Sequence, residues 1–435
     1  MLSNAIQFDL PATASYIVGR TNTTWLPLGS ATYTPDTGTR LLRFVLSDGR
    51  GFLDPSSVVL SFRLMNTGAG KLRLRDVPIT IFRRIKCFCN GTLIEDLVEA
   101  PRLASLMRLC EPKERQENEK LLSNWTEGDA HDRSDVGIPP GYGRRVYTDL
   151  RILGIFRIAK HLPISHMSIT IEFELADGAE AFYSPMAAVA DPALPAVAHS
   201  QSYALQDVQI QGDMLELTQE LLSRYSSLLD QGKHFPIAFT TWTNSRHVLL
   251  NARDQDVATT RALSLLKTVF ISFSTTDTRT LFASSQPTGF AGKFATWNTF
   301  LNPRYTVSAQ WSDDQDQFNW EVQIGGRHWP AHHVRGVNSE TYYHLRQALD
   351  MAVWGQSSFN ISDWNHIRWL AGIDLERGAG TLDNLSMTGY STRAGEPLTF
   401  KLKGFDTAAM PNVAYLHLCH DAILTVSRGG CEVSI

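Results

Sequence analysis

The 435-residue sequence lacks the features of a secreted, membrane-spanning or nucleic-acid-binding protein. Its five cysteines are an odd number without the spacing of a disulfide framework, so we expect reduced thiols. No apolar run is long enough to span a bilayer, and the start MLSNAIQFDLP lacks the basic and apolar regions of a signal peptide. The net charge of −4 argues against a basic nucleic-acid-binding face. These absences predict a soluble protein made in the cytosol.

The short motifs of common catalytic sites are also missing. There is no GxSxG elbow, HExxH sequence, phosphate-binding loop or Rossmann glycine fingerprint. Glu95 and Asp96 are adjacent carboxylates, and adjacent side chains on a strand point to opposite faces. Asp313, Asp314 and Asp316 have oxygen ligands for calcium, although a solvated acidic loop is the commoner role of such a run. We therefore predict no enzyme activity and no catalytic or cofactor-binding residues.

Three histidines in GGRHWPAHH, residues 325–333, raise the question of a metal site. The two glycines predict a hairpin turn, and we expect Pro330 to end the pairing of the returning strand. His332 and His333 are adjacent and would point apart on an extended backbone, and no carboxylate or cysteine stands nearby to complete a ligand set. We expect these two residues and His328 to bind no metal.

Two other pairs of potential ligands are assigned to packing. Cys87 and Cys89 share one side of a strand with Ile85, and the second ligand pair of a zinc site is missing. We expect both cysteines to be small buried side chains. His417 and His420 have an odd spacing, which puts them on opposite faces of a strand and argues against joint coordination. No metal site is predicted.

The sequence is rich in apolar and polar residues that alternate with a period of two. The clearest segments are 60–64, 169–175, 320–324 and 398–402. Strands of this kind have one buried face and are typical of antiparallel sheets. No strand–helix–strand cadence is present, which argues against a parallel α/β fold. The pattern predicts an all-β fold of sandwiches or barrels.

Three stretches have apolar residues at helical spacing instead. They cover residues 103–110, 217–229 and 342–352, and they predict short helices that lie against a sheet. Asp213 and Glu216 would form a capping box at the start of the second helix.

The clearest break in composition is PMAAVADPALPAVAHS, residues 185–200. Its three prolines continue neither a strand ladder nor a regular helix. We predict an N-terminal arm at 1–15, a first domain at 16–185, an Ala/Pro-rich linker at 186–201 and a second domain at 202–435. Each domain contains a strand, a tight glycine turn and a second strand, in IKCFCNGTLIED and WEVQIGGRHWPA.

Several segments, taken in order, resemble a known family. In the first half they are TPDTGTRLLRFVLSDGRGFLDPSSVVLSFRL, ITIFRRIKCFCNGTLIEDL and LGIFRIAKHLPISHMSITIEFEL. In the second half they are SYALQDVQIQGDMLEL, ALSLLKTVFISFS, FNWEVQIGGRHWP, ETYYHLRQAL, WLAGIDLERG and YLHLCHDAILTVSRGGCEV. In this order, over nearly the whole chain, they resemble the double jelly-roll major capsid proteins of icosahedral double-stranded DNA viruses. The compact type found in virophages, Polinton-like viruses and adintoviruses is the most similar.

The resemblance implies two tandem eight-stranded antiparallel jelly-roll β-sandwiches with a few short helices. Three chains would then form a homotrimeric capsomer with a pseudo-hexagonal outline. The implied partners are neighbouring capsomers and penton and minor capsid proteins, without sequence-specific nucleic acid. The question whether an internal membrane lies beneath the shell stays open. The implied location is the virion, after assembly inside the host cell.

A second interpretation is a tandem β-sandwich protein that binds or cleaves carbohydrate. Trp242, Trp311 and Trp329 would stack on sugars if they were exposed. A capsid protein would instead be a trimer, so the mass in solution separates the two interpretations.

Deletion of residues 2–12 is expected to leave a folded trimer with a nearly unchanged melting temperature and to weaken particle assembly. The segment shows neither strand alternation nor a helical stripe, and Pro11 interrupts any ladder, so it buries little of itself within its own subunit. Calorimetry and sedimentation of the deleted and full chains test this. A monomeric or unfolded deletion variant would contradict it, and so would one that assembles as efficiently as the full chain.

Overall fold

The computed structural model describes most of the chain in separate ranges. These are residues 17–36, 39–48, 51–74, 76–116, 118, 137–182, 199–274, 300–303, 318–337, 339–349, 359, 364, 368–376, 389–392, 397–405 and 411–435. The predicted arm, most of the predicted linker, Trp311 and the acidic run at 313–316 lie outside the described residues.

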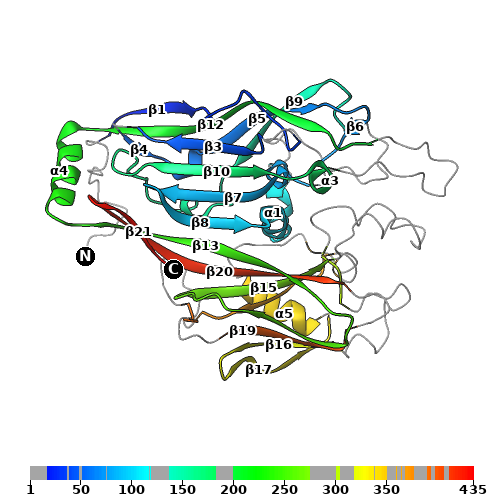
Figure 1. The fold of residues 1–435 in the computed structure, drawn as a ribbon. Helices are drawn as coiled ribbons and strands as arrows, with labels where there is room; N and C mark the ends of the chain where they lie inside the picture. Colours follow the sequence, from blue (N-terminus) through cyan, green and yellow to red (C-terminus); the bar gives the residue numbers. More distant parts are fainter. Residues whose placement is uncertain are drawn as a thin grey trace, which may run out of the picture.

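Strands dominate both halves of the protein (Figure 1). The first half contains β1 (Ile17–Trp25), β2 (Thr32–Tyr33), β3 (Leu41–Leu46), β4 (Gly51–Leu53), β5 (Val59–Asn66), β6 (Lys71–Leu72), β7 (Phe82–Cys89), β8 (Thr92–Val98), β9 (Gly143–Asp149), β10 (Ile169–Leu175), β11 (His199–Ser200) and β12 (Tyr203–Leu217). The second contains β13 (Phe235–Val248), β14 (Asp254–Thr259), β15 (Leu266–Ser274), β16 (Asn319–Ile324), β17 (Arg327–Arg335), β18 (Ala371–Asp374), β19 (Leu398–Lys403), β20 (Val413–Ser427) and β21 (Gly430–Ser434).

The helices are few and short. Those in the described residues are α1 (Ala100–Leu109), α3 (Gly178–Ala181), α4 (Gln219–Asp230) and α5 (Ser339–Ala348), with 3₁₀ turns η3 (Pro55–Ser57), η4 (Pro78–Ile81) and η5 (Gly154–Phe156). None of the helices in the described ranges is long and apolar enough to cross a membrane.

Both halves have the same strand order. In the first half the sheets run β1-β12-β5-β9 and β3-β10-β7-β8, and in the second they run β13-β20-β15-β18 and β14-β19-β16-β17. If the eight main strands of each half are numbered along the chain, both halves read 1-8-3-6 and 2-7-4-5. This order, with antiparallel neighbours, is that of a jelly roll, so the predicted fold class is confirmed.

The predicted domain boundary is wrong. Strand β12 was assigned to the second domain, but it pairs with β1 and β5 of the first, with Trp25 opposite Ile210 and Leu64 opposite Leu205. The eighth strand of a jelly roll must return between the first and the third. The Pro/Ala-rich break therefore separates strands seven and eight of one roll, and helix α4 connects the rolls. The second roll begins at β13.

The alternation of apolar and polar residues correctly predicts which side chains are buried in the two cores. In β10 the side chains of Ile169, Ile171 and Phe173 are fully buried, and in β19 Phe400 and Leu402 are fully buried. Burial of each such side chain contributes about 1.5–3 kcal/mol to folding. The two strands occupy the same seventh position in their rolls, so each alternating segment supplies one wall of its own core.

Helices α1 and α5 confirm two of the predicted helical stripes, and α4 confirms the third. The capping box is wrong, because Asp213 and Glu216 lie in β12, opposite β1. The helix instead follows Thr218, whose side chain makes no capping hydrogen bond. Strand pairing continues to Leu217 and takes precedence over the local capping pattern.

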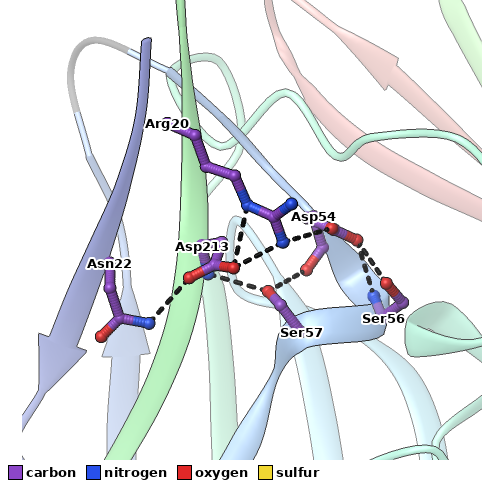
Figure 2. A network of polar contacts seen from close by, with 6 residues as sticks. All are labelled: Arg20, Asn22, Asp54, Ser56, Ser57 and Asp213. Atoms are coloured by element: carbon purple, nitrogen blue, oxygen red, sulfur yellow. Dashed lines mark hydrogen bonds and ion pairs between the residues drawn. The ribbon is translucent and has the colours of Figure 1, made fainter.

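Asp213 instead anchors the end of β12 in a polar network (Figure 2). Its carboxylate accepts hydrogen bonds from Asn22 Nδ2 at 2.7 Å and Arg20 Nε at 2.9 Å, both on β1. Arg20 also lies 3.3 Å from Asp54, and Ser57 Oγ accepts from the Asp213 amide at 2.8 Å. The bond from Asn22, followed by Arg20, lowers the pKa of Asp213. The network holds β12 in place where the chain leaves the first roll.

The two predicted glycine turns occupy equivalent places. Asn90 and Gly91 join β7 to β8, and Gly325 and Gly326 join β16 to β17. Both hairpins connect strands four and five of their rolls. Gly325 has a φ of 58° and Gly91 a φ of 85°, a backbone region that favours glycine. The faint similarity of the two sequence segments thus reflects the repeated fold.

Pro330 does not end strand pairing, contrary to our prediction. Val322 pairs with Trp329, and Trp320 pairs with Val334, so the ladder continues on both sides of the proline. The register shifts between Trp320 and Val322. A bulge of this kind leaves residues outside the ladder and tolerates a residue without an N–H.

Candidate functional site

The two jelly rolls meet along β8 of the first and β13 of the second, which lie next to each other in Figure 1. Several polar side chains are buried at this contact, which we call the inter-roll contact. It consists of Glu95, Val98, Arg102, Gly154, Ile155 and Arg157 of the first roll and Thr240, Thr241, Asn244, Ser274, Phe300, Tyr415 and His417 of the second.

Glu95 is the central group of the inter-roll contact. Only 3% of this residue is exposed. Its Oε1 accepts a hydrogen bond from the Gly154 amide at 2.8 Å and one from the Thr241 hydroxyl, and its Oε2 accepts from the Ile155 amide at 3.2 Å. Burial raises the pKa of Glu95, while the three hydrogen bonds and the Arg157 charge oppose that shift. One carboxylate therefore connects β8, η5 and the second roll.

Backbone groups approach closely beside Glu95. A Cβ atom added at Gly154 would lie 2.0 Å from the Thr240 carbonyl oxygen, so only glycine fits here without movement. The same carbonyl accepts a hydrogen bond from Arg157 Nη2 at 3.1 Å. Burial lowers the pKa of Arg157. The rolls thus touch through main chain as well as side chains.

Arg102 of helix α1 forms a second part of the contact. The residue is 2% exposed, and its Nη2 donates a hydrogen bond to Ser274 Oγ in β15. Its guanidinium lies over the rings of Phe300 and Tyr415, with 5.4 and 5.0 Å to the centroids. Such cation–π contacts stabilise a buried guanidinium that has lost its water. A first-roll cation is therefore held by second-roll side chains.

The two predicted strand histidines, His417 and His420, are buried in β20, and their rings contact different residues. His417 Nδ1 lies 2.9 Å from Asn244 Oδ1, and His420 Nε2 lies 3.0 Å from Thr243 Oγ1. Asn244 also donates to the Val98 carbonyl of the first roll at 2.9 Å. Burial, with the Arg102 charge, lowers the pKa of His417 to about 3, and burial lowers that of His420 to about 4. Both rings are therefore neutral at pH 7.

The GGRHWPAHH histidines contact carboxylates that the sequence analysis overlooked. The Nδ1 atoms of His328 and His333 lie 3.2 and 3.0 Å from Glu321 Oε2, and His332 Nε2 lies 3.3 Å from Glu340 Oε1. Glu321 lies in β16 before the hairpin turn, and the pairing of β17 with β16 places the histidines beside it. The expectation that no carboxylate stands nearby is therefore wrong. In the ranges that the structure describes, no group of three or more His, Cys, Asp or Glu residues is arranged to hold a metal ion.

The other candidate residues separate into packing roles. Cys87 and Cys89 are fully buried, as predicted. Glu95 and Asp96 diverge as expected, since Asp96 pairs with Arg84 at 2.6 Å while Glu95 enters the inter-roll contact. Trp242 is 8% exposed and packs on Phe270.

Trp329 is half-buried against Tyr390, with 5.0 Å between ring centroids. The burial of Trp242 and the partial burial of Trp329 disfavour a role for these two rings in stacking on sugars.

Comparison with solved structures gives matches along the whole chain, whereas no protein-family model and no curated protein sequence matches. A quasi-atomic model of the PBCV-1 virus capsid has a TM-score of 0.66 at 12% identity and covers 98% of this chain and 99% of its own. PBCV-1 VP54, fitted into a cryo-EM reconstruction of the virophage Sputnik, has a TM-score of 0.65 at 11% identity with the same coverage. The protein has the double jelly-roll fold. The Faustovirus major capsid protein also matches, with a TM-score of 0.57 at 10% identity over 97% of this chain and 93% of its own.

Gly154→Ala is expected to destabilise this double jelly roll by about 1–3 kcal/mol, because the new methyl group overlaps the Thr240 carbonyl and forces the rolls apart. Gly326→Ala is the matched control, since a Cβ there meets no atom within 4 Å. Denaturant unfolding of both variants measures the difference. Equal stability of the two variants would show that the rolls do not meet at Gly154.

Stability of the double jelly roll is expected to fall as the pH drops below about 6.5, the ordinary histidine pKa of the unfolded chain. Folded His420 keeps a pKa of about 4, so between these values the unfolded state binds a proton that the folded state does not. The loss is about 1.4 kcal/mol per pH unit for each such histidine.

Denaturant unfolding from pH 7 to 5 tests this dependence. The slope of the unfolding free energy against pH counts the protons taken up on unfolding. His420→Gln should reduce this count by one, whereas His161→Gln, which alters an exposed histidine, should leave it unchanged. An unchanged slope in His420→Gln would contradict the assignment.

Proposed function

We propose that this chain is a structural major capsid protein that forms trimeric, pseudo-hexagonal capsomers of an icosahedral virus shell. The observation that carries the proposal is the repetition of one jelly-roll strand order in two rolls of a single chain. Three such chains place six similar rolls around an axis, which fits a subunit that fills near-six-fold positions with three-fold symmetry. The capsid proteins that share the fold over nearly the whole chain support this role.

The inter-roll contact suits the same role. A shell subunit must keep its two rolls at a fixed angle so that its edges match those of its neighbours. Glu95, Arg102 and Arg157 are polar groups whose burial is tolerated only while their partners in the opposite roll stay in place. They therefore disfavour sliding of one roll over the other. We infer a structural role without catalysis, in the virion, with neighbouring capsomers and penton and minor capsid proteins as partners.

Exposed apolar side chains occur at equivalent places in the two rolls. Leu26 and Leu28 follow the first strand of the first roll and are 68% and 57% exposed. Val248 and Leu250, at the end of the first strand of the second roll, are 70% and 74% exposed. Apolar side chains at matched positions suit contacts that repeat around a pseudo-six-fold ring. We propose that both sites contact neighbouring subunits.

The purified protein is expected to be a trimer, three times the 48.6 kDa of one chain, with a hexagonal outline in negative stain. Leu250→Glu should shift the trimer towards a folded monomer, because a charge in an apolar interface is costly while the side chain is exposed in the monomer. Tyr343→Glu, at a 56% exposed residue on α5, is the control and should leave the trimer intact.

Light scattering and sedimentation give the masses. A monomer that binds glycans would contradict the proposal and favour the carbohydrate-binding interpretation. A trimer that withstands Leu250→Glu would exclude the second-roll site from the interface.

A further inference from the structure

Two cysteines from opposite rolls meet at the end of the inter-roll contact. Cys89 is the last residue of β7 in the first roll, and Cys431 lies in β21, which extends the second roll and lies against β8. The residues are 342 positions apart in sequence, and their Sγ atoms lie 2.7 Å apart. That separation exceeds the length of a disulfide bond by only about 0.7 Å.

The backbone on both sides is fixed by strand pairing. Cys89 is opposite Thr92 of β8 and Ile169 of β10, and Cys431 is opposite Val426 of β20. Thr92 Oγ1 also donates a hydrogen bond to the Cys431 carbonyl oxygen at 2.9 Å. The thiols are therefore held close together by the register of two sheets and by the hydrogen bond between Thr92 and the Cys431 carbonyl.

The surroundings give the two sulfur atoms different reactivities. Cys89 is fully buried, and its hydrogen bond to Cys431 together with burial raises its pKa. Cys431 is half-buried, and hydrogen bonds from Cys89 and from Asn90 Nδ2, the latter at 3.3 Å, lower its pKa. A thiolate is the nucleophile in disulfide exchange, so Cys431 is the group that reacts first.

We propose that Cys89 and Cys431 form a disulfide that links the two jelly rolls when the protein meets a low-molecular-weight disulfide as oxidant. The Cys431 thiolate attacks one sulfur of the small disulfide, forms a mixed disulfide and releases one small thiolate. The Cys89 sulfur then attacks the Cys431 sulfur of the mixed disulfide, and its proton leaves with the second small thiol. Two protein thiols are oxidised, and one small disulfide is reduced to two thiols.

The expected result is the loss of two thiols from the five in the chain. The purified full chain is incubated with oxidised glutathione, denatured and titrated with a thiol reagent, which should find three thiols instead of five. Cys110→Ser, the control, alters a cysteine at the end of α1 and should fall from four to two. Cys431→Ser should keep all four.

Peptide mapping without reduction identifies the bond. Trypsin releases a peptide with both Cys87 and Cys89, bounded by Lys86 and Arg102, and this peptide should be joined to the one that carries Cys431. The joined species should persist in Cys87→Ser and disappear in Cys89→Ser. The melting temperature of the oxidised full chain should exceed that of the reduced chain by a few degrees, with no such difference in Cys431→Ser.

Either of two outcomes would overturn the proposal. One is a full chain that keeps five thiols after oxidation, and the other is a bond that joins two separate chains on a non-reducing gel. The test does not depend on the capsid role, because thiols and peptides are counted per chain of the purified protein and no assembled particle is needed.

Discussion

The structure depends on a carboxylate that cannot be solvated. Glu95 is enclosed where the two jelly rolls meet, and it keeps its hydrogen-bond partners only if β8, η5 and β13 lie in one arrangement. Burial of an unpaired carboxylate is far more costly than burial of an apolar side chain. The group therefore penalises every other placement of the rolls more than it stabilises this one. Apolar packing holds each roll together, whereas polar groups set the angle between the rolls.

The alternation of apolar and polar residues in the sequence was sufficient to predict which side chains form the cores of the rolls. Segments such as 169–175 and 398–402 alternate because one face of each strand is buried, and that requirement is local to the strand. The resemblance added the strand order and the number of rolls. The Pro/Ala-rich break was assigned to the wrong junction, since a break in composition does not tell which strands it separates. Only the pairing of β12 with β1 and β5 decides that.

The inter-roll contact could not be predicted in the same way. Glu95 stands beside Asp96 in a strand, and nothing in TLIEDLV tells which carboxylate is buried. Its partners, Gly154 of the same roll and Thr241 of the second, are 59 and 146 positions away, so the full set meets only after both rolls have formed. Cys89 and Cys431 show the same limit, because each looks like an isolated cysteine in its own segment. Glu321 was overlooked for a smaller reason: it approaches His328 and His333 by pairing across a hairpin.

The shared strand order also governs when each roll becomes stable during synthesis. The eighth strand lies next to the first and the third, so β1 has its only partner in the described sheet at β12, with Ile17 opposite Leu217. Until residue 217 has left the ribosome, the first sheet lacks a central strand, and the exposed edges of β1 and β5 are open to wrong partners. Such distant pairing slows folding. The nascent chain therefore depends on protection from aggregation for longer than a protein of the same size built from local hairpins.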